Sequence, residues 1–221
     1  MTSLWAVVPA AGVGRRVGGE TPKQYLPLAG RSVIDHSIAP LIDHPDIEAV
    51  CVALGPEDPW WPSTDYSRHP GVLTVTGGEE RVHSVRNALE AVAARSAPED
   101  WVLVHDAARP NLRAADLDHL IDVLRDHVVG GVLGMPVRDT MKRADAEGVV
   151  RATVSREGLW HAFTPQMFRI GVLIEAIDRG FAAGFAMTDE ASAMEAAGHA
   201  PLMVAGHADN LKITHPEDLP L

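Results

Sequence analysis

Short apolar segments alternate along the chain with longer segments whose apolar positions recur at helical spacing. The apolar runs predict strands at Leu4–Val8, Ala49–Leu54, Val72–Thr76, Trp101–His105 and Gly131–Met135. Between the last three of these runs, apolar side chains follow a helical period over Val82–Val92 and over Leu117–Val128. Because strands that alternate with helices form right-handed βαβ crossovers, we expect an α/β fold with a mostly parallel sheet.

A polar hairpin interrupts this alternation after Pro136. Two segments, Val137–Ala144 and Val149–Val154, flank a short turn sequence. Both are too polar for a central sheet, so we expect them to project as an arm. An isolated two-stranded arm is only marginally stable in water, so a partner surface is expected to cover it. Beyond the arm, the pattern predicts a helix that starts near Phe168, a last helix at Ala191–Ala197 and a strand at Leu202–Ala205.

Composition places the chain among globular proteins. Its 221 residues are 46% hydrophobic and 22% charged, which suits one α/β domain with a single core and excludes a disordered chain. The 19 basic and 30 acidic side chains give a net charge of −11, which disfavours nucleic acids and anionic membranes as partners. The first residues form no basic leader, and no apolar run approaches the roughly 20 residues of a membrane span. The expected location is therefore the cytoplasm.

Residues that could bind a transition metal are scattered along the chain. The 11 histidines lack the spacing of a helical metal pair, so we expect no zinc site. The single cysteine, Cys51, lies inside a predicted strand. We therefore expect a buried thiol with a structural role, and neither a disulfide nor a thiolate cluster.

The first predicted strand runs into a loop, Pro9–Arg16, that suits a phosphate group. Pro9 cannot donate to a sheet ladder, so the strand is expected to end there. The small residues that follow leave backbone N–H groups open to an anion; they are Ala10, Ala11, Gly12 and Gly14. The third glycine of a dinucleotide fingerprint is missing at Val17, and Gly-Lys-Ser/Thr occurs nowhere, so neither NAD nor a P-loop is indicated.

Charged and small residues near this loop each have two interpretations. Arg16 and Lys23 are either solvated surface charges or the cations that neutralise a bound triphosphate. Asp106 follows the fourth predicted strand, and it either caps the next helix or holds magnesium, directly or through water. A diglycine, Gly77–Gly78, precedes the predicted helix that carries Ser84, where the backbone can approach a flat ligand.

Taken in order, these segments resemble those of bacterial 2-C-methyl-D-erythritol 4-phosphate cytidylyltransferases, a family of the non-mevalonate isoprenoid pathway. The resemblance covers nearly the whole chain, through Pro9–Arg16, Pro22–Pro27, Gly77–Arg81, Val104–Pro110, Val137–Arg143, Gly158–Gln166, Thr188–Ser192 and Asp209–Thr214. Other nucleotidyltransferases share single motifs, whereas the ordered combination is specific. The resemblance implies one domain over residues 1–221, with a doubly wound, mostly parallel sheet of the Rossmann-like nucleotidyltransferase type and a projecting hairpin arm.

The resemblance also implies an activity, namely transfer of a cytidylyl group from CTP to 2-C-methyl-D-erythritol 4-phosphate with release of pyrophosphate. Arg16 and Lys23 would be the catalytic cations. The implied nucleotide-binding residues are Pro9, Ala10, Ala11, Gly12, Gly14, Gly78, Glu79, Ser84 and Ala107. Magnesium would be the cofactor, with Asp106 as its ligand and Asp209 as a second candidate.

The second substrate would be held by residues that match the family's substrate-binding positions, which are Arg109, Thr140, Arg156, Thr164, Thr188 and Lys212. Thr140 and Arg156 belong to the arm, residues 137–157, which in this family reaches into the neighbouring subunit. A homodimer with shared sites is therefore implied. From spacing alone, each threonine would be read as an ordinary residue with a satisfied hydroxyl.

Two other functions remain open from the sequence. A related enzyme could transfer a different nucleotide to another small phosphate or alcohol, such as ribitol 5-phosphate, although the segment Val137–Arg143 disfavours this. A nucleotide-binding regulatory subunit would keep the glycine loop and lose the cations. Arg16, Lys23 and Asp106 are all present, which favours an enzyme.

Overall fold

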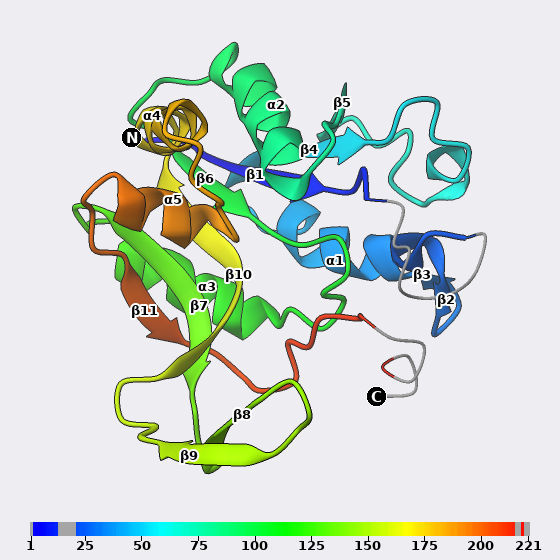
Figure 1. The fold of residues 1–221 in the computed structure, drawn as a ribbon. Coiled ribbons are helices and arrows are strands. Elements are labelled where there is room, and N and C mark those ends of the chain that lie inside the picture. Colours follow the sequence, from blue (N-terminus) through cyan, green and yellow to red (C-terminus); the bar gives the residue numbers. More distant parts are fainter. Residues whose placement is uncertain (1, 13–20, 215–217, 219–221) are drawn as a thin grey trace.

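A seven-stranded sheet forms the centre of the protein in the computed structural model, which describes residues 2–12, 21–214 and 218. Its strands are β1 (Leu4–Pro9), β4 (Ile47–Leu54), β5 (Val72–Thr76), β6 (Trp101–Val104), β7 (Gly130–Pro136), β10 (Trp160–Arg169) and β11 (Leu202–Ala205). They lie in the order β11-β7-β10-β6-β1-β4-β5 (Figure 1). Only β10 runs antiparallel to its two neighbours in this sheet. The expected mostly parallel sheet is confirmed.

Helices cover both faces of the sheet, as expected for a doubly wound fold. On one face, α1 (Val33–Ile42) and α3 (Ala114–Leu124) pack into one apolar cluster with the strands. On the other face, α2 (Arg81–Ala93), α4 (Ile170–Ala182) and α5 (Glu190–Ala196) form a second cluster. Alternate side chains of one strand enter different clusters, Val8 the first and Val7 the second, because successive strand residues point to opposite faces.

The strand β10 was not predicted. Its buried run contains Thr164 and Gln166, whose polar side chains interrupt the apolar signal of a central strand. The expected helix start near Phe168 was therefore too early, because α4 begins at Ile170. The helical stripe through Val128 was also too long, since α3 ends at Leu124 and Val128 is 91% exposed.

The α1 helix was not predicted either, and the structure shows a clear start signal for it. Ser32 and Asp35 form a capping box, in which each side chain accepts from the backbone N–H of the other. Short elements lead into this helix, namely the 3₁₀ turn η1 (Lys23–Tyr25) and the pair β2 (Pro27–Leu28) and β3 (Arg31–Ser32). A second 3₁₀ turn, η2 (Trp61–Ser63), follows β4.

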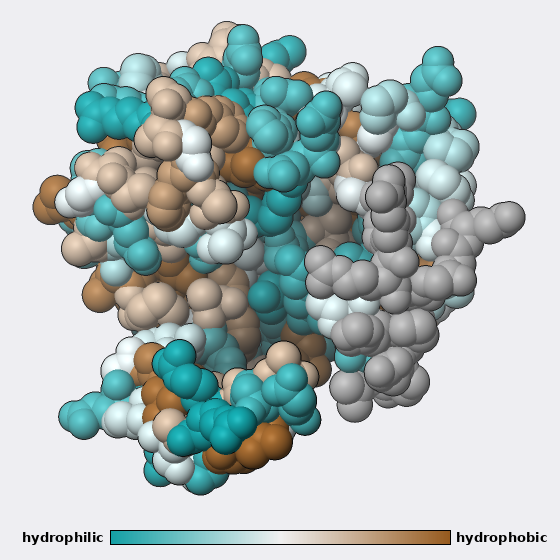
Figure 2. All heavy atoms as spheres, in the orientation of Figure 1, coloured by the Kyte–Doolittle hydropathy of each residue, from teal (hydrophilic) through white to brown (hydrophobic). Residues whose placement is uncertain are grey.

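The predicted polar hairpin is present and stands apart from the body. Its strands β8 (Met141–Ala144) and β9 (Val150–Val154) pair antiparallel with each other and form a sheet of their own. The first strand is shorter than expected, because Val137 is buried at the base and donates its N–H to Leu159 instead. Figures 1 and 2 show the arm projecting from the end of the body where β7 and β10 emerge.

The structure confirms a buried position for Cys51 in β4. Burial raises the pKa of its thiol to about 12, so the group is unreactive at neutral pH. Within the described residues, we find no helix of the length and apolarity that a bilayer crossing requires.

Candidate active site

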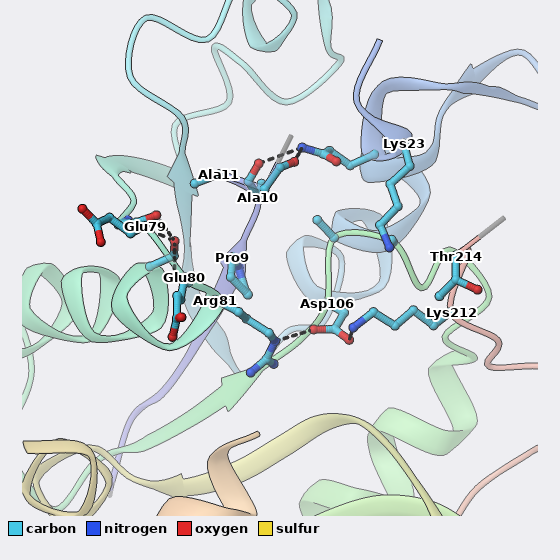
Figure 3. A pocket seen from close by; sticks show the side chains of 16 residues that line it. Pro9, Ala10, Ala11, Lys23, Glu79, Glu80, Arg81, Asp106, Lys212 and Thr214 are labelled. Atoms are coloured by element: carbon cyan, nitrogen blue, oxygen red, sulfur yellow. Dashed lines mark hydrogen bonds and ion pairs between the residues drawn. The ribbon is translucent and has the colours of Figure 1, made fainter. Parts of the chain in front are cut away.

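A cavity of about 740 Å³ opens beyond the carboxyl ends of β1, β5 and β6 (Figure 3). Ligands bind at this edge of a parallel α/β sheet. The lining residues come from the loop after β1, from η1, from the turn into α2, from the loop after β6 and from the C-terminal segment. They are Pro9–Gly12, Lys23, Gln24, Gly78–Arg81, Ser84, Asp106–Ala108, Lys212 and Thr214.

The glycine loop is fixed by a side chain that sequence reasoning did not single out. Gln24 is buried, and its Nε2 donates to the carbonyl oxygens of Ala10 at 2.8 Å and of Gly12 at 3.0 Å. A Cβ added at Gly12 would meet nothing within 4 Å, so the backbone there borders open space. Gly14 and Arg16 lie outside the described residues. The part of the loop that is described has the unshielded backbone that a phosphate group needs.

The diglycine turn packs directly on this loop. A Cβ at Gly77 would lie 2.4 Å from the Cβ of Ala11 and 2.8 Å from Oγ of Ser84, so only glycine fits there. The N–H of Gly78 donates to Oγ of Ser84 at 3.1 Å. The first glycine is therefore explained by contact between two loops, and the second lies at the cavity wall with Ser84 and Glu79.

Lys23 extends from η1 to the cavity, as Figure 3 shows. Its Nζ donates to the carbonyl oxygen of Ile213 at 2.7 Å. The side chain therefore also connects the start of the chain with the C-terminal segment.

Asp106 lies at the centre of a cluster of cations. Its Oδ1 accepts from Nε of Arg81 at 2.8 Å, and its Oδ2 lies 2.8 Å from Nζ of Lys212 and 3.5 Å from Nε of Arg109. Burial opposes ionisation of this carboxyl, but the three cations outweigh it and hold its pKa well below the usual range. The interpretation of Asp106 as a helix cap is wrong, because the residue before α3 is Arg113.

A buried hydrogen-bond chain fixes the backbone at Asp106. The N–H of Asp106 donates to Oγ1 of Thr164 at 3.0 Å, and Oγ1 lies 3.0 Å from Nδ1 of His105. Nε2 of His105 lies 3.1 Å from the carbonyl oxygen of Arg109, which can only accept, so we assign the ring proton to Nε2. The Thr164 hydroxyl then donates to Nδ1. Burial lowers the pKa of His105 to about 4, so the ring is neutral at pH 7.

A smaller hollow of about 190 Å³ adjoins the main cavity and shares Arg81, Asp106 and Lys212 with it. Of the six residues implied for the second substrate, four line this hollow, namely Arg109, Thr164, Thr188 and Lys212. Arg109 is fixed there, because its Nη1 donates to the carbonyl oxygen of Asn210 at 2.6 Å and its guanidinium lies over the Phe163 ring.

The other two implied substrate residues, Thr140 and Arg156, are exposed on the arm and line neither cavity. Arg156 donates to the carbonyl oxygen of Arg138 within the arm. Asp209, the second metal candidate, pairs with Arg113 at 2.6 Å and lines a different hollow near the base of the arm. The structure therefore does not bring Asp209 to the cavity that contains Asp106.

Comparison with known proteins relates this geometry to one family. The family profile of 2-C-methyl-D-erythritol 4-phosphate cytidylyltransferase matches residues 4–221. The chain belongs to this family. It is 54% identical over 218 residues to the cytidylyltransferase of that name from Hahella chejuensis, covering 99% of this chain and 90% of the relative. The corresponding protein of Ectopseudomonas mendocina is 53% identical over 219 residues, with 99% and 93% covered.

Solved structures of this family have the same fold. The cytidylyltransferase of Francisella tularensis is 34% identical, covers 99% of this chain and 97% of its own, and superimposes with a TM-score of 0.86. That of Thermus thermophilus is 31% identical over 97% of this chain and 94% of its own, with a TM-score of 0.78. The chain is therefore a nucleotidyltransferase enzyme, and its membership of this family disfavours the two alternatives that the sequence left open.

A divalent cation fits this cavity only with help from a ligand. Among the described residues, no three His, Cys, Asp or Glu side chains are grouped closely enough to hold an ion by themselves. Asp106 offers one ionised carboxylate beside the glycine loop. Magnesium usually keeps several waters and takes one or two carboxylates together with substrate phosphates. The Asp106 carboxylate therefore suits magnesium that arrives with a nucleotide.

Two more residues of the site were not predicted from the sequence, Arg81 and Glu190. Nη1 and Nη2 of Arg81 donate to Oε1 and Oε2 of Glu190 at 2.6 and 3.1 Å. Burial raises the pKa of Glu190 and Arg81 opposes that rise; because both of its oxygens accept from N–H groups, the geometry requires the carboxylate. Both residues fall inside segments that resemble the family, Gly77–Arg81 and Thr188–Ser192, but their contact joins positions 109 residues apart.

Proposed function

We propose that this chain transfers the cytidylyl group of CTP to 2-C-methyl-D-erythritol 4-phosphate. The products are 4-diphosphocytidyl-2-C-methyl-D-erythritol and pyrophosphate, in the biosynthesis of isoprenoid precursors. One observation carries the proposal: in a chain of this family, the glycine loop, Lys23 and Asp106 border one cavity beside a second, cationic hollow. Two anionic substrates can therefore lie next to each other with cations on both sides.

The chemistry needs charge stabilisation more than proton transfer. An oxygen of the substrate's phosphate attacks the α-phosphorus of CTP, and the bond from that phosphorus to pyrophosphate breaks. The second pKa of a phosphate monoester is about 6, so the nucleophile is mostly dianionic at pH 7 and needs no general base. Lys23, together with Arg16, stabilises the charge that develops on the phosphoryl oxygens and the leaving group.

The nucleotide occupies the larger cavity. The N–H groups of the loop after Pro9 bind its phosphates, and Gly78, Glu79 and Ser84 border the base. Asp106 would be the protein ligand of a magnesium ion that arrives with the nucleotide, and that ion would supply charge neutralisation of the triphosphate. Asp106 suits this role because neighbouring cations keep it ionised.

The acceptor phosphate occupies the smaller hollow, where Arg109 and Lys212 supply positive charge and Thr188 a hydroxyl group. The hydroxyl of Thr164 already accepts from Asp106 and donates to His105. Its main effect is therefore to fix the backbone of the Asp106 loop, and the acceptor can use only its remaining lone pair.

We further propose that the chain acts as a single-domain homodimer in which the arm, residues 137–157, completes the site of the partner subunit. Two features support this. In the part of the chain that the structure describes, β8 and β9 pair only with each other, and a two-stranded ribbon is marginally stable alone. Val149 and Val150 of the arm expose 51% and 57% of their surface, and Leu159, two residues after the arm, exposes 39%, which leaves apolar area for a partner to cover.

Arg156 and Thr140 would then act in trans. We expect Arg156→Ala and Lys23→Ala homodimers to be nearly inactive, whereas a mixed dimer has one site with both changes and one with neither. Purified heterodimers should therefore recover activity, up to one intact site per dimer. If they stay as inactive as the parents while both chains fold and bind CTP, Arg156 serves its own subunit.

Pyrophosphate release tests the activity itself. The purified protein is incubated with each nucleoside triphosphate and 2-C-methyl-D-erythritol 4-phosphate, ribitol 5-phosphate or no acceptor, with magnesium or with a chelator. We expect release only with magnesium and the methylerythritol phosphate, fastest with CTP, and a product of the expected mass. Efficient turnover of ribitol 5-phosphate would assign the chain to the related enzyme class, and binding without turnover would make it a regulatory subunit.

A further inference from the structure

Arg81 lies between two carboxylates that come from different parts of the chain. Its Nε contacts Oδ1 of Asp106 at 2.8 Å, and its two terminal nitrogens contact Glu190 at 2.6 and 3.1 Å. Figure 3 shows Arg81 reaching Asp106 from the side opposite to Lys212. All three guanidinium nitrogens are therefore engaged, and the planar fork fixes the direction from which Asp106 is held.

Glu190 is anchored independently of Arg81. It is the first residue of α5 and only 2% exposed. The preceding residue, Asp189, caps this helix and also accepts from Nε2 of Gln166 in β10 at 2.9 Å. Oε1 of Gln166 accepts from the N–H of Ala191 at 2.8 Å. The backbone at Glu190 is thus a fixed point, and from it the buried carboxylate reaches Arg81.

The two oxygens of Asp106 are bound with different firmness. If Arg81 left Oδ1, the buried carboxylate of Glu190 would also lose its partner, which is costly. Lys212 on Oδ2 is different, because its side chain is 37% exposed and Asp106 is its ion-pair partner in the described structure. A long, partly solvated ammonium can move away with little loss. Oδ2 is therefore the oxygen that can change partners.

Glu190 also sets the charge of the cluster. Arg81, Arg109 and Lys212 face the two carboxylates of Asp106 and Glu190. Without the charge of Glu190, three cations would surround a single carboxylate, and the approach of a divalent cation to Asp106 would be strongly opposed. A residue that lines neither cavity thereby influences what Asp106 can bind.

We propose that Glu190 and Arg81 are positioning residues that hold Asp106 by Oδ1 and leave Oδ2 to exchange Lys212 for the divalent cation of the nucleotide complex. Lys212, once released, faces the adjoining hollow, which it also lines. Arrival of the metal–nucleotide complex is thus coupled to the appearance of a free cation for the acceptor phosphate. This inference rests on the proposed function, because it assumes a phosphate-bound metal at Asp106.

Binding of Mn²⁺ in the absence of the acceptor tests the inference without turnover. Free Mn²⁺ is followed by its electron paramagnetic resonance signal in the presence of the protein and CTP. In the variant Glu190→Gln, we expect binding of Mn²⁺ to the protein–CTP complex to weaken on the order of 10–100-fold, as when the residue that orients a metal ligand is changed. Binding of CTP without metal should change less than about threefold. The factor by which kcat falls should be larger than the factor by which the KM for CTP changes.

A second variant separates positioning from folding. Arg81→Lys keeps the charge, but a single ammonium cannot hold Asp106 and both oxygens of Glu190 in one geometry. It should lose Mn²⁺ binding to a similar extent. The control is Asp178→Asn, which breaks another two-contact pair made by the same helix, Arg86 with Asp178 at 2.7 and 3.1 Å, on the exposed surface. This control should behave as the unaltered protein.

The outcomes are distinct. If Glu190→Gln and Arg81→Lys fold and bind Mn²⁺ with CTP as the unaltered protein does, the proposal is overturned. If both variants fail to fold while the control folds, the pair serves stability alone and the proposal is also overturned. If the unaltered protein neither releases pyrophosphate nor binds Mn²⁺ with CTP, the proposed function itself fails.

Discussion

Replacing His105 should remove a pH dependence from the stability of this protein. The ring is fully buried and neutral, and it accepts from Thr164 and donates to the carbonyl of Arg109. Glutamine at this position can still donate to that carbonyl through its amide, but it cannot titrate. The comparison of His105→Gln with the unaltered protein therefore isolates the protonation of one side chain.

The direction and size of this pH effect on stability follow from the pKa values of His105 in the folded and in the unfolded chain. Burial lowers the pKa of His105 to about 4 in the folded chain, against 6.5 for the ordinary side chain. As the pH falls below 6.5, the unfolded chain binds a proton that the folded chain does not, so stability is lost between pH 6.5 and pH 4. Below pH 4 both states are protonated and the loss stops. The gap between the two pKa values corresponds to about 3 kcal/mol of unfolding free energy.

Urea unfolding at a series of pH values between 4 and 8 measures this effect. The stability of the unaltered protein minus that of His105→Gln should be constant above pH 7 and fall by about 3 kcal/mol toward pH 4. Carboxylates that titrate in both proteins cancel in the difference. A difference that does not vary with pH would refute the reasoning, because His105 would then be either protonated in the folded state or accessible to water.

Three further substitutions test the walls of the main cavity. Lys23→Ala should lower kcat by on the order of 10²-fold, measured at saturating substrates, and should lower stability by only about 1 kcal/mol through the lost contact with Ile213. Gln24→Leu removes both donors to the loop carbonyls, so the KM for CTP should rise on the order of tenfold while the fold, followed by circular dichroism, is retained. Gly77→Ala places a Cβ 2.4 Å from that of Ala11, so calorimetry should show weaker CTP binding, together with a stability loss of about 1–3 kcal/mol. If the kinetics or the binding of any of the three variants were unchanged, the role assigned to that residue would be wrong.

The parts of the fold that could be predicted are those in which neighbours along the chain decide the outcome. The strand Val72–Thr76 and the strand Leu202–Ala205 were predicted with the observed bounds, because short runs bounded by glycine or proline have few other solutions. The hairpin arm could be predicted because its two segments are too polar for a central sheet and flank a short turn sequence. β10 could not, since its polar residues Thr164 and Gln166 depend on hydrogen bonds to distant partners, His105 and Ala191 of α5.

In the site too, local features could be predicted from the sequence and contacts between distant residues could not. Pro9 and the small residues after it could be singled out, because a strand that ends in a glycine loop is a local feature. The position of Asp106 after a strand could be read from the sequence, but not the three cations around it, which come from positions 81, 109 and 212. Gln24 and Glu190 carry no local signal at all. Their effects depend on a carbonyl or a guanidinium that folding brings to them.

The described lining of the main cavity is balanced in charge, because three cations lie there with Glu79, Glu80 and Asp106, whereas the whole chain is acidic. A net charge of −11 repels nucleotides at long range, yet Lys23, Arg81 and Lys212 converge on the main cavity. At physiological ionic strength, exposed charges are screened beyond about 8 Å, so the surface acids contribute little inside the cavity. Partly buried cations are screened far less, and they determine what binds. Affinity for two anionic substrates must therefore come from short-range contacts with cations whose positions are fixed. Lys23 is fixed by the carbonyl oxygen of Ile213, and Arg81 is fixed by Glu190.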